Sequence, residues 1–130
     1  MIDKIALLYI KNGKVLSTRS IGKDTWYFPG GKREGSESDL ETLVREIREE
    51  LSVDIQPETV EFYGVFEAQA HGKAEGVVVR MTCYTAKFAG EPEPDHEIAE
   101  LTWMTSADAW RSSTVDQLIF ADLKGKELID

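Results

Sequence analysis

Residues 31–53 read GKREGSESDLETLVREIREELSV and combine a helical apolar pattern with a dense set of acidic residues. Ser38 is followed three residues later by Glu41, a pair typical of a capping box at the start of a helix. Apolar side chains then recur at the spacing of one helix face, at Leu40, Leu43, Val44, Ile47 and Leu51. The pattern predicts a helix over residues 36–52 with one buried face.

A second arc of this helix carries carboxylates and no basic side chain. Glu46 and Glu50 are four residues apart and project from the same side, with Glu49 beside them. Like charges at that spacing cost a helix about 0.2–0.5 kcal/mol per pair. An ordinary solvent-exposed helix face would also explain these carboxylates, because the charges of Glu41, Arg45 and Glu49 alternate between negative and positive along the helix. Converging carboxylates are also what a hard cation such as Mg²⁺ binds, so charge alone leaves both interpretations open.

The residues before the helix, WYFPGGK at 26–32, begin like a strand and end in residues that strand interiors avoid. Pro29 has no N–H for a strand ladder, and Gly30 and Gly31 have no side chains to pack. The sequence allows two explanations. Either this is an ordinary turn, or the fold needs backbone without side chains at this place.

Outside this region the chain alternates between short strands and one further helix. Asn12-Gly13, a strong hairpin signal, separates apolar runs at 4–10 and 14–18. Further strands are expected at 25–28, 60–70, 76–88 and 98–104, and a second helix is expected at 114–128. About six strands and two helices predict an α/β (α+β) domain over residues 1–130, with helices packed against a curved mixed sheet.

Charge and composition exclude several classes of partner. The net charge is −9 and the isoelectric point is about 4.7, which argues against a nucleic-acid or anionic-membrane surface. Cys83 is the only cysteine, so no internal disulfide is expected. The longest apolar run near the N-terminus is too short for a membrane span or a signal-peptide core, and a cytoplasmic location is the default expectation.

Residues 31–53 resemble the signature of the Nudix hydrolases, including the MutT-like pyrophosphohydrolases. The matching positions are Gly31, Glu37, Arg45, Glu46, Glu49 and Glu50. The preceding FPGGK is also usual in that family. Two positions depart from the pattern: Ser52 stands where a glycine usually closes the motif, and Ser36 stands where a glycine usually precedes Glu37. The first departure changes a helix C-cap, where glycine is favoured for its left-handed backbone.

The resemblance implies a Nudix fold, with a mixed β-sheet sandwiched between helices, and metal-dependent hydrolysis of a nucleoside diphosphate linked to another moiety. Mg²⁺ is the implied cofactor, and Mn²⁺ suits the same oxygen ligands. The implied metal ligands are Glu46, Glu49, Glu50, the backbone carbonyl of Gly30 and, from a later loop, Glu97. At Glu97 an ordinary loop charge is an equal alternative. The general base stays open among these glutamates.

The remaining site residues have supporting roles. Arg45 and Glu37 are implied to pair, to brace the loop against the helix and to orient Glu49. Arg19, Lys32 and Arg80 are candidates for substrate binding. For Arg19 a solvated surface position explains the residue nearly as well.

The substrate is expected to be a small-molecule nucleotide. The stretch FEAQAHGK lacks the proline typical of ADP-ribose hydrolases and the tyrosine typical of dinucleoside polyphosphate hydrolases. This favours a nucleoside triphosphate, cleaved to a monophosphate and pyrophosphate. ADP-ribose or nucleotide-sugar hydrolysis and a non-catalytic nucleotide-binding module are the alternatives. Many relatives form dimers, so a homodimer is allowed, but nothing in the sequence identifies an interface.

Overall fold

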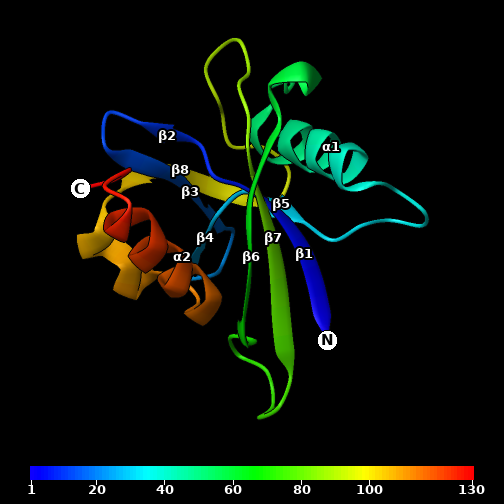
Figure 1. Ribbon diagram of the computed structural model, residues 1–130. Coiled ribbons are helices and arrows are strands. Elements are labelled where there is room, and N and C mark those ends of the chain that lie inside the picture. The colour runs from blue at the N-terminus through cyan, green and yellow to red at the C-terminus, as the bar shows by residue number, and fades with distance from the viewer.

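A computed structural model describes residues 1–130 and arranges eight strands and two long helices in layers (Figure 1). The strands are β1 Ile2–Leu7, β2 Ile10–Lys11, β3 Lys14–Ser20, β4 Trp26–Tyr27, β5 Gly30–Gly31, β6 Glu61–Gln69, β7 Val78–Thr85 and β8 Ile98–Met104. The helices are α1 Asp39–Leu51 and α2 Thr114–Gly125, with short 3-10 helices η1 Pro57–Thr59 and η2 Ser106–Arg111. Neither α1 nor α2 has the length and hydropathy that a membrane-spanning helix requires.

The strands form two four-stranded sheets, where the sequence predicted a single curved sheet. In the first sheet the order is β5-β1-β7-β6, with β1 parallel to β7 and the other neighbours antiparallel. In the second sheet β3 pairs antiparallel with β2, β4 and β8. The α+β class with mixed sheets is confirmed. The extra strands are two-residue elements that apolar patterns do not reveal.

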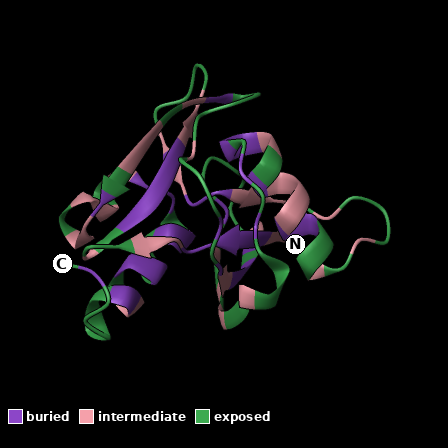
Figure 2. Cartoon of the chain, turned by 90° about the horizontal axis from the view of Figure 1, so that it is seen from above, coloured by how far each residue is buried: buried purple, intermediate pink, exposed green.

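Strand β1 separates two hydrophobic clusters because alternate side chains of a strand point to opposite faces. Ile5 and Leu7 pack with apolar residues of α1, whereas Ala6 and Leu8 pack with apolar residues of α2. A strand that is apolar on both faces is covered on both. Figure 2 shows the result: buried backbone runs through the central strands, and exposed residues gather on loops and outer helix turns.

Helix α1 confirms the predicted helix but begins at Asp39 instead of residue 36. The side chain of Ser38 accepts a hydrogen bond from the Glu41 N–H (3.1 Å), and the Glu41 carboxylate accepts one from the Ser38 N–H (2.9 Å). This capping box fixes the helix start, and the chain before it turns at Gly35, where φ is +56°. Three residues of the predicted apolar face are fully buried: Leu43, Ile47 and Leu51.

The predicted hairpin at Asn12-Gly13 is confirmed, with φ values of +54° and +75° that suit a tight two-residue turn. The apolar run at 4–10, however, does not form one strand. It ends as β1 at Leu7, and residues 10 and 11 pair with β3 in the other sheet. The chain therefore crosses between the two sheets at this point.

Candidate active site

The glycine pair forms a strand, which corrects the expectation that no strand would use it. Gly30 pairs with Ala6 and Gly31 with Ile5 of β1. A Cβ on Gly30 would overlap the carbonyl oxygen of Ile5, and its φ of +145° is rarely adopted by other residues. A Cβ on Gly31 would lie 2.5 Å from the carboxylate carbon of Glu46. Backbone without side chains is needed because β1 and a glutamate of α1 both approach it closely.

Glu50 is a buried carboxylate at the centre of the site. Its exposure is 7%, and its Oε1 accepts a hydrogen bond of 2.9 Å from the Gly30 N–H. No Lys or Arg forms an ion pair with it. Burial raises the pKa of Glu50 to about 8, and the charges of Glu46, Glu97 and Glu49 raise it in the same direction. A buried carboxylate destabilises the folded protein unless a nearby cation or a bound proton compensates its charge. The carboxylate oxygens gathered here are ligands that suit a divalent cation.

Glu46 and Glu49 share a cationic neighbour on the same helix. Arg45 Nη1 lies 2.9 Å from a carboxylate oxygen of Glu46 and 3.5 Å from one of Glu49. Burial raises the pKa of Glu46, while Glu49 is more exposed. The structure contains no group of three His, Cys, Asp or Glu side chains arranged to hold a metal ion.

Arg45 and Glu37 meet, as the resemblance implies, and tie the loop at 32–37 to the helix. The Arg45 guanidinium donates to both Glu37 oxygens, at 2.7 and 2.8 Å, and to the Lys32 carbonyl at 3.0 Å. Glu37 also accepts from the Glu34 N–H and the Thr42 hydroxyl. The bonds from Arg45, then the backbone N–H, lower the pKa of Glu37 to about 2. Loop and helix are thus held as one unit.

Glu46 and Glu50 face a cleft of about 570 Å³ between the two sheets, whereas the predicted ligand Glu49 is not among the residues that line it. Gly30, Glu46, Glu50 and Glu97 line it, and Lys32 lies at the same wall. Glu97 comes from the loop before β8, so the structure brings it to the acidic side chains of α1 although 47 positions separate it from Glu50.

A smaller cavity of about 140 Å³ adjoins the cleft, and the two share the side chains of Lys4, Tyr27 and Met81. Its walls are mostly apolar, and Lys4, His71, Lys73 and Ser113 contribute polar groups. The other lining residues are Ile2, Ala70, Val79 and Val115. The acidic cleft and the mostly apolar cavity therefore adjoin each other at the shared side chains.

Lys4 is a cleft-lining residue that the sequence analysis missed, whereas His71 is an exposed turn residue, as expected. Lys4 lies on the inner face of β1, near the Tyr27 ring, and its pKa is lowered by burial. The strand alternation was a usable signal, because Lys4 falls in phase with the buried Ala6 and Leu8. His71 follows a strand in a turn, and its Nε2 lies 3.2 Å from the Thr25 hydroxyl.

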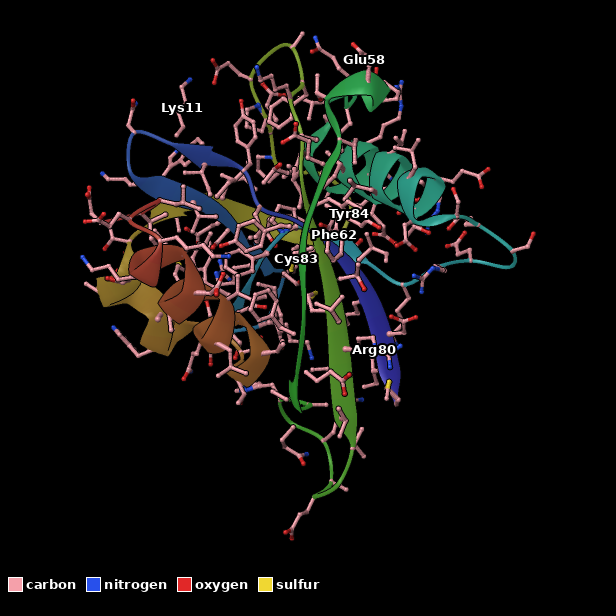
Figure 3. All side chains as sticks on the ribbon, in the orientation of Figure 1. Lys11, Glu58, Phe62, Arg80, Cys83 and Tyr84 are labelled. Carbon is pink, nitrogen blue, oxygen red and sulfur yellow. The ribbon has the colours of Figure 1, made fainter.

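Arg19 and Arg80 are not brought into the cleft. Arg19 pairs with Glu100, and its Nη1 donates to the Lys23 carbonyl at 2.9 Å. Arg80 lies 3.4 Å from Glu67 on the neighbouring strand, on the face of β7 opposite to Met81. Figure 3 shows Arg80 further along the sheet from α1 than Tyr84.

Comparison with known proteins agrees with this geometry. The model of the NUDIX domain family matches residues 3–123. The CTP pyrophosphohydrolase of Escherichia coli K12 is 31% identical over 114 residues, which cover 84% of this chain and 79% of that protein. The solution structure of the E. coli ORF135 protein is 27% identical with a TM-score of 0.74, covering 100% of this chain and 95% of that one.

A MutT protein from Bacillus halodurans shows the same fold at 22% identity, with a TM-score of 0.73 and coverage of 99% of this chain and 86% of that one. The family match spans nearly the whole chain, and residues 31–53 fold into a loop and helix that bring Glu46 and Glu50 to one cleft. The chain therefore belongs to the Nudix hydrolase family and is a Nudix-type pyrophosphohydrolase.

Proposed function

We propose that this protein hydrolyses a nucleoside triphosphate to a nucleoside monophosphate and pyrophosphate, with Mg²⁺ or Mn²⁺ as cofactor. One observation carries the proposal. The buried Glu50, with Glu46 and Glu97 nearby, faces a cleft that adjoins a mostly apolar cavity. A triphosphate and a nucleobase need those two environments side by side.

The metal would be held by Glu46, Glu50 and Glu97, which line the cleft, together with the carbonyl of Gly30, and Glu49 would join them by turning toward the cleft. A bound divalent cation supplies positive charge to a polyanionic substrate and lowers the pKa of bound water. Within the chain, Gly30 donates its N–H to Glu50 and so fixes the direction of that carboxylate. Arg45 holds Glu46 from the other side. This also explains how a protein of net charge −9 can act on phosphates.

The nucleoside would occupy the smaller cavity. Val79, Met81 and Val115 supply apolar walls on which a base can pack, and Ser113 supplies a hydroxyl. Lys4 lies where the two spaces join, and Lys32 lies beside the carboxylates. Both lysines would contact phosphate oxygens as point charges. The similarity to a CTP pyrophosphohydrolase supports a triphosphate as substrate.

A release assay tests the proposal. The purified protein is incubated with the common nucleoside triphosphates, oxidised purine triphosphates, ADP-ribose, nucleotide sugars and dinucleoside polyphosphates, with Mg²⁺, Mn²⁺ or chelator. We expect pyrophosphate from a triphosphate, abolished by the chelator. Cleavage of ADP-ribose or a nucleotide sugar in preference would replace the substrate and keep the metal. Nucleotide binding without any turnover would contradict hydrolysis and indicate a binding module.

A further inference from the structure

We propose that Ser52, Asp95 and His96 form a clamp that positions Glu97 in the active-site cleft. The proposal deepens the function above, since it rests on Glu97 being a metal ligand. It concerns the segment 93–97, which has no helix or strand of its own before β8 begins at Ile98. Such a segment needs other contacts to hold a side chain in place.

The segment is attached to the end of α1. The last carbonyl groups of a helix have no partner within the helix, and here three of them accept hydrogen bonds from the segment. The bonds run from the Glu93 N–H to Leu51 O (2.9 Å), from the Asp95 N–H to Glu50 O (3.1 Å) and from His96 Nδ1 to Glu49 O (2.9 Å). Two of the three acceptor residues, Glu49 and Glu50, also carry acidic side chains of α1, so the segment is joined to the helix at those residues.

Ser52 adds a side-chain bond that glycine cannot make. It adopts the left-handed conformation, with φ of 57° and ψ of 31°, at the position where the family usually has glycine. For a residue with a Cβ this conformation is energetically unfavourable. Its hydroxyl lies 2.9 Å from Asp95 Oδ2, and it donates to that carboxylate. The other oxygen of Asp95 accepts from the His96 N–H at 2.7 Å.

The clamp ends immediately before Glu97. His96 has a φ of +51°, so the backbone reverses at this residue and directs the next one toward the cleft. The carbonyl of Glu97 accepts a hydrogen bond of 2.7 Å from the Ile21 N–H on the other side. Glu97 is thus fixed between the end of α1 and the turn after β3, and its side chain lines the cleft beside Glu50.

The test measures Mn²⁺ binding to the full chain, by calorimetry or by electron paramagnetic resonance, together with kcat/KM. The variants are Ser52→Gly, Glu97→Gln and the double variant. Ser52→Gly relieves the backbone strain, so its melting temperature should equal or exceed that of the wild type. We expect Ser52→Gly to weaken Mn²⁺ binding about tenfold, the lower end for partners that orient metal ligands. The double variant should bind no more weakly than Glu97→Gln alone.

Two further variants separate the clamp from a general effect. Ser52→Asn should restore Mn²⁺ affinity, because asparagine tolerates the left-handed conformation and its amide can donate to Asp95. Ser36→Gly, which restores the other family glycine in an exposed loop, should change nothing.

The outcomes are distinguishable. If Glu97→Gln leaves Mn²⁺ affinity unchanged, the proposed role of Glu97 fails and the clamp has nothing to position. If Glu97→Gln weakens binding but Ser52→Gly does not, the clamp alone is overturned. Additive losses in the double variant would also overturn it, because Ser52 would then act independently of Glu97.

Discussion

Gly31 lies directly against the carboxylate of Glu46, so close that a Cβ on the glycine would come within 2.5 Å of the carboxylate carbon and 2.7 Å of its second oxygen. Both residues line the cleft. The absence of a side chain on β5 therefore decides where a carboxylate of α1 can sit. The two-residue strand β5 thus affects the site by setting the position of the Glu46 carboxylate.

Replacing Gly31 by alanine should reduce activity more than stability. The atoms in the way belong to the end of a flexible side chain, so Glu46 can move aside and the fold should lose only about 1–2 kcal/mol. We expect kcat/KM to fall at least tenfold because Glu46 leaves its position. Gly30→Ala is the comparison, since it meets the Ile5 backbone and a positive φ, and should cost about 3 kcal/mol or more. Full activity in a folded Gly31→Ala variant would contradict the argument.

Glu50→Gln should abolish most turnover and leave the fold intact. The substitution keeps the shape and the bond from the Gly30 N–H but removes a charge that is buried beside other carboxylates. We expect kcat to fall about 10²–10³-fold, as when one preorganised electrostatic group is lost. The melting temperature should hold or rise. Glu58→Gln, on the exposed η1 helix (Figure 3), is the matched control and should behave as wild type. Equal turnover in both variants would remove Glu50 from the metal set.

Arg45→Lys should show that the planar guanidinium with its several donors matters more for activity than the positive charge alone. The guanidinium bonds Glu37 twice and also bonds Glu46 and the Lys32 carbonyl. A lysine keeps the charge but cannot span these partners. We expect kcat/KM to fall about 10–100-fold, the range for groups that orient metal ligands, with little change in KM. A variant with wild-type kinetics would assign Arg45 to a surface ion pair.

The buried Asp116 should make the stability of the folded protein depend on pH. It is fully buried at the start of α2, with one oxygen bonded to the Phe28 N–H at 3.1 Å and the other without a partner. Burial raises its pKa to about 7, above the usual 3.8, although Lys4 opposes the shift. Because the folded chain keeps a proton that the unfolded chain loses, stability should fall as pH rises from about 4 to about 7.

The measurement compares melting temperatures of the wild type and Asp116→Asn across that range. The variant has no ionisable group at this position, so only the wild type should lose stability through this residue as pH rises. The melting temperature of the variant relative to that of the wild type should therefore increase with pH and become constant above pH 7. Parallel curves at every pH would show that Asp116 titrates alike in both states.

Lys4 should affect substrate binding, whereas Arg80 should not. Lys4 lies at the junction of the cleft and the smaller cavity, and Arg80 lies on the outer face of the sheet. We expect Lys4→Met to raise KM about tenfold or more, as for the loss of a hydrogen bond to a charged group. Arg80→Met is the matched control, with unchanged KM. The reverse result would place the phosphates on the other face of the sheet.

Much of the local structure could be predicted because its causes are local. The Ser38–Glu41 capping box, the apolar face of α1 and the Asn12-Gly13 turn each depend on residues a few positions apart, and all three are present. The second sheet could not be predicted, because whether Ile10 pairs within its own sheet or with β3 depends on contacts that periodicity does not record. For the same reason Gly30 and Gly31 looked unsuited to a strand.

The acidic face of α1 and the family resemblance could be recognised from residue spacing within 31–53, and the Arg45–Glu37 pair that the resemblance implied is present in the structure. Which basic side chains reach the cleft, by contrast, depends on how distant segments pack in three dimensions. The tertiary structure turned Lys4 inward, paired Arg19 and Arg80 with glutamates outside, and joined the segment before β8 to the end of α1. These outcomes depend on packing between distant segments, where burial and competing partners, rather than spacing, select the neighbours.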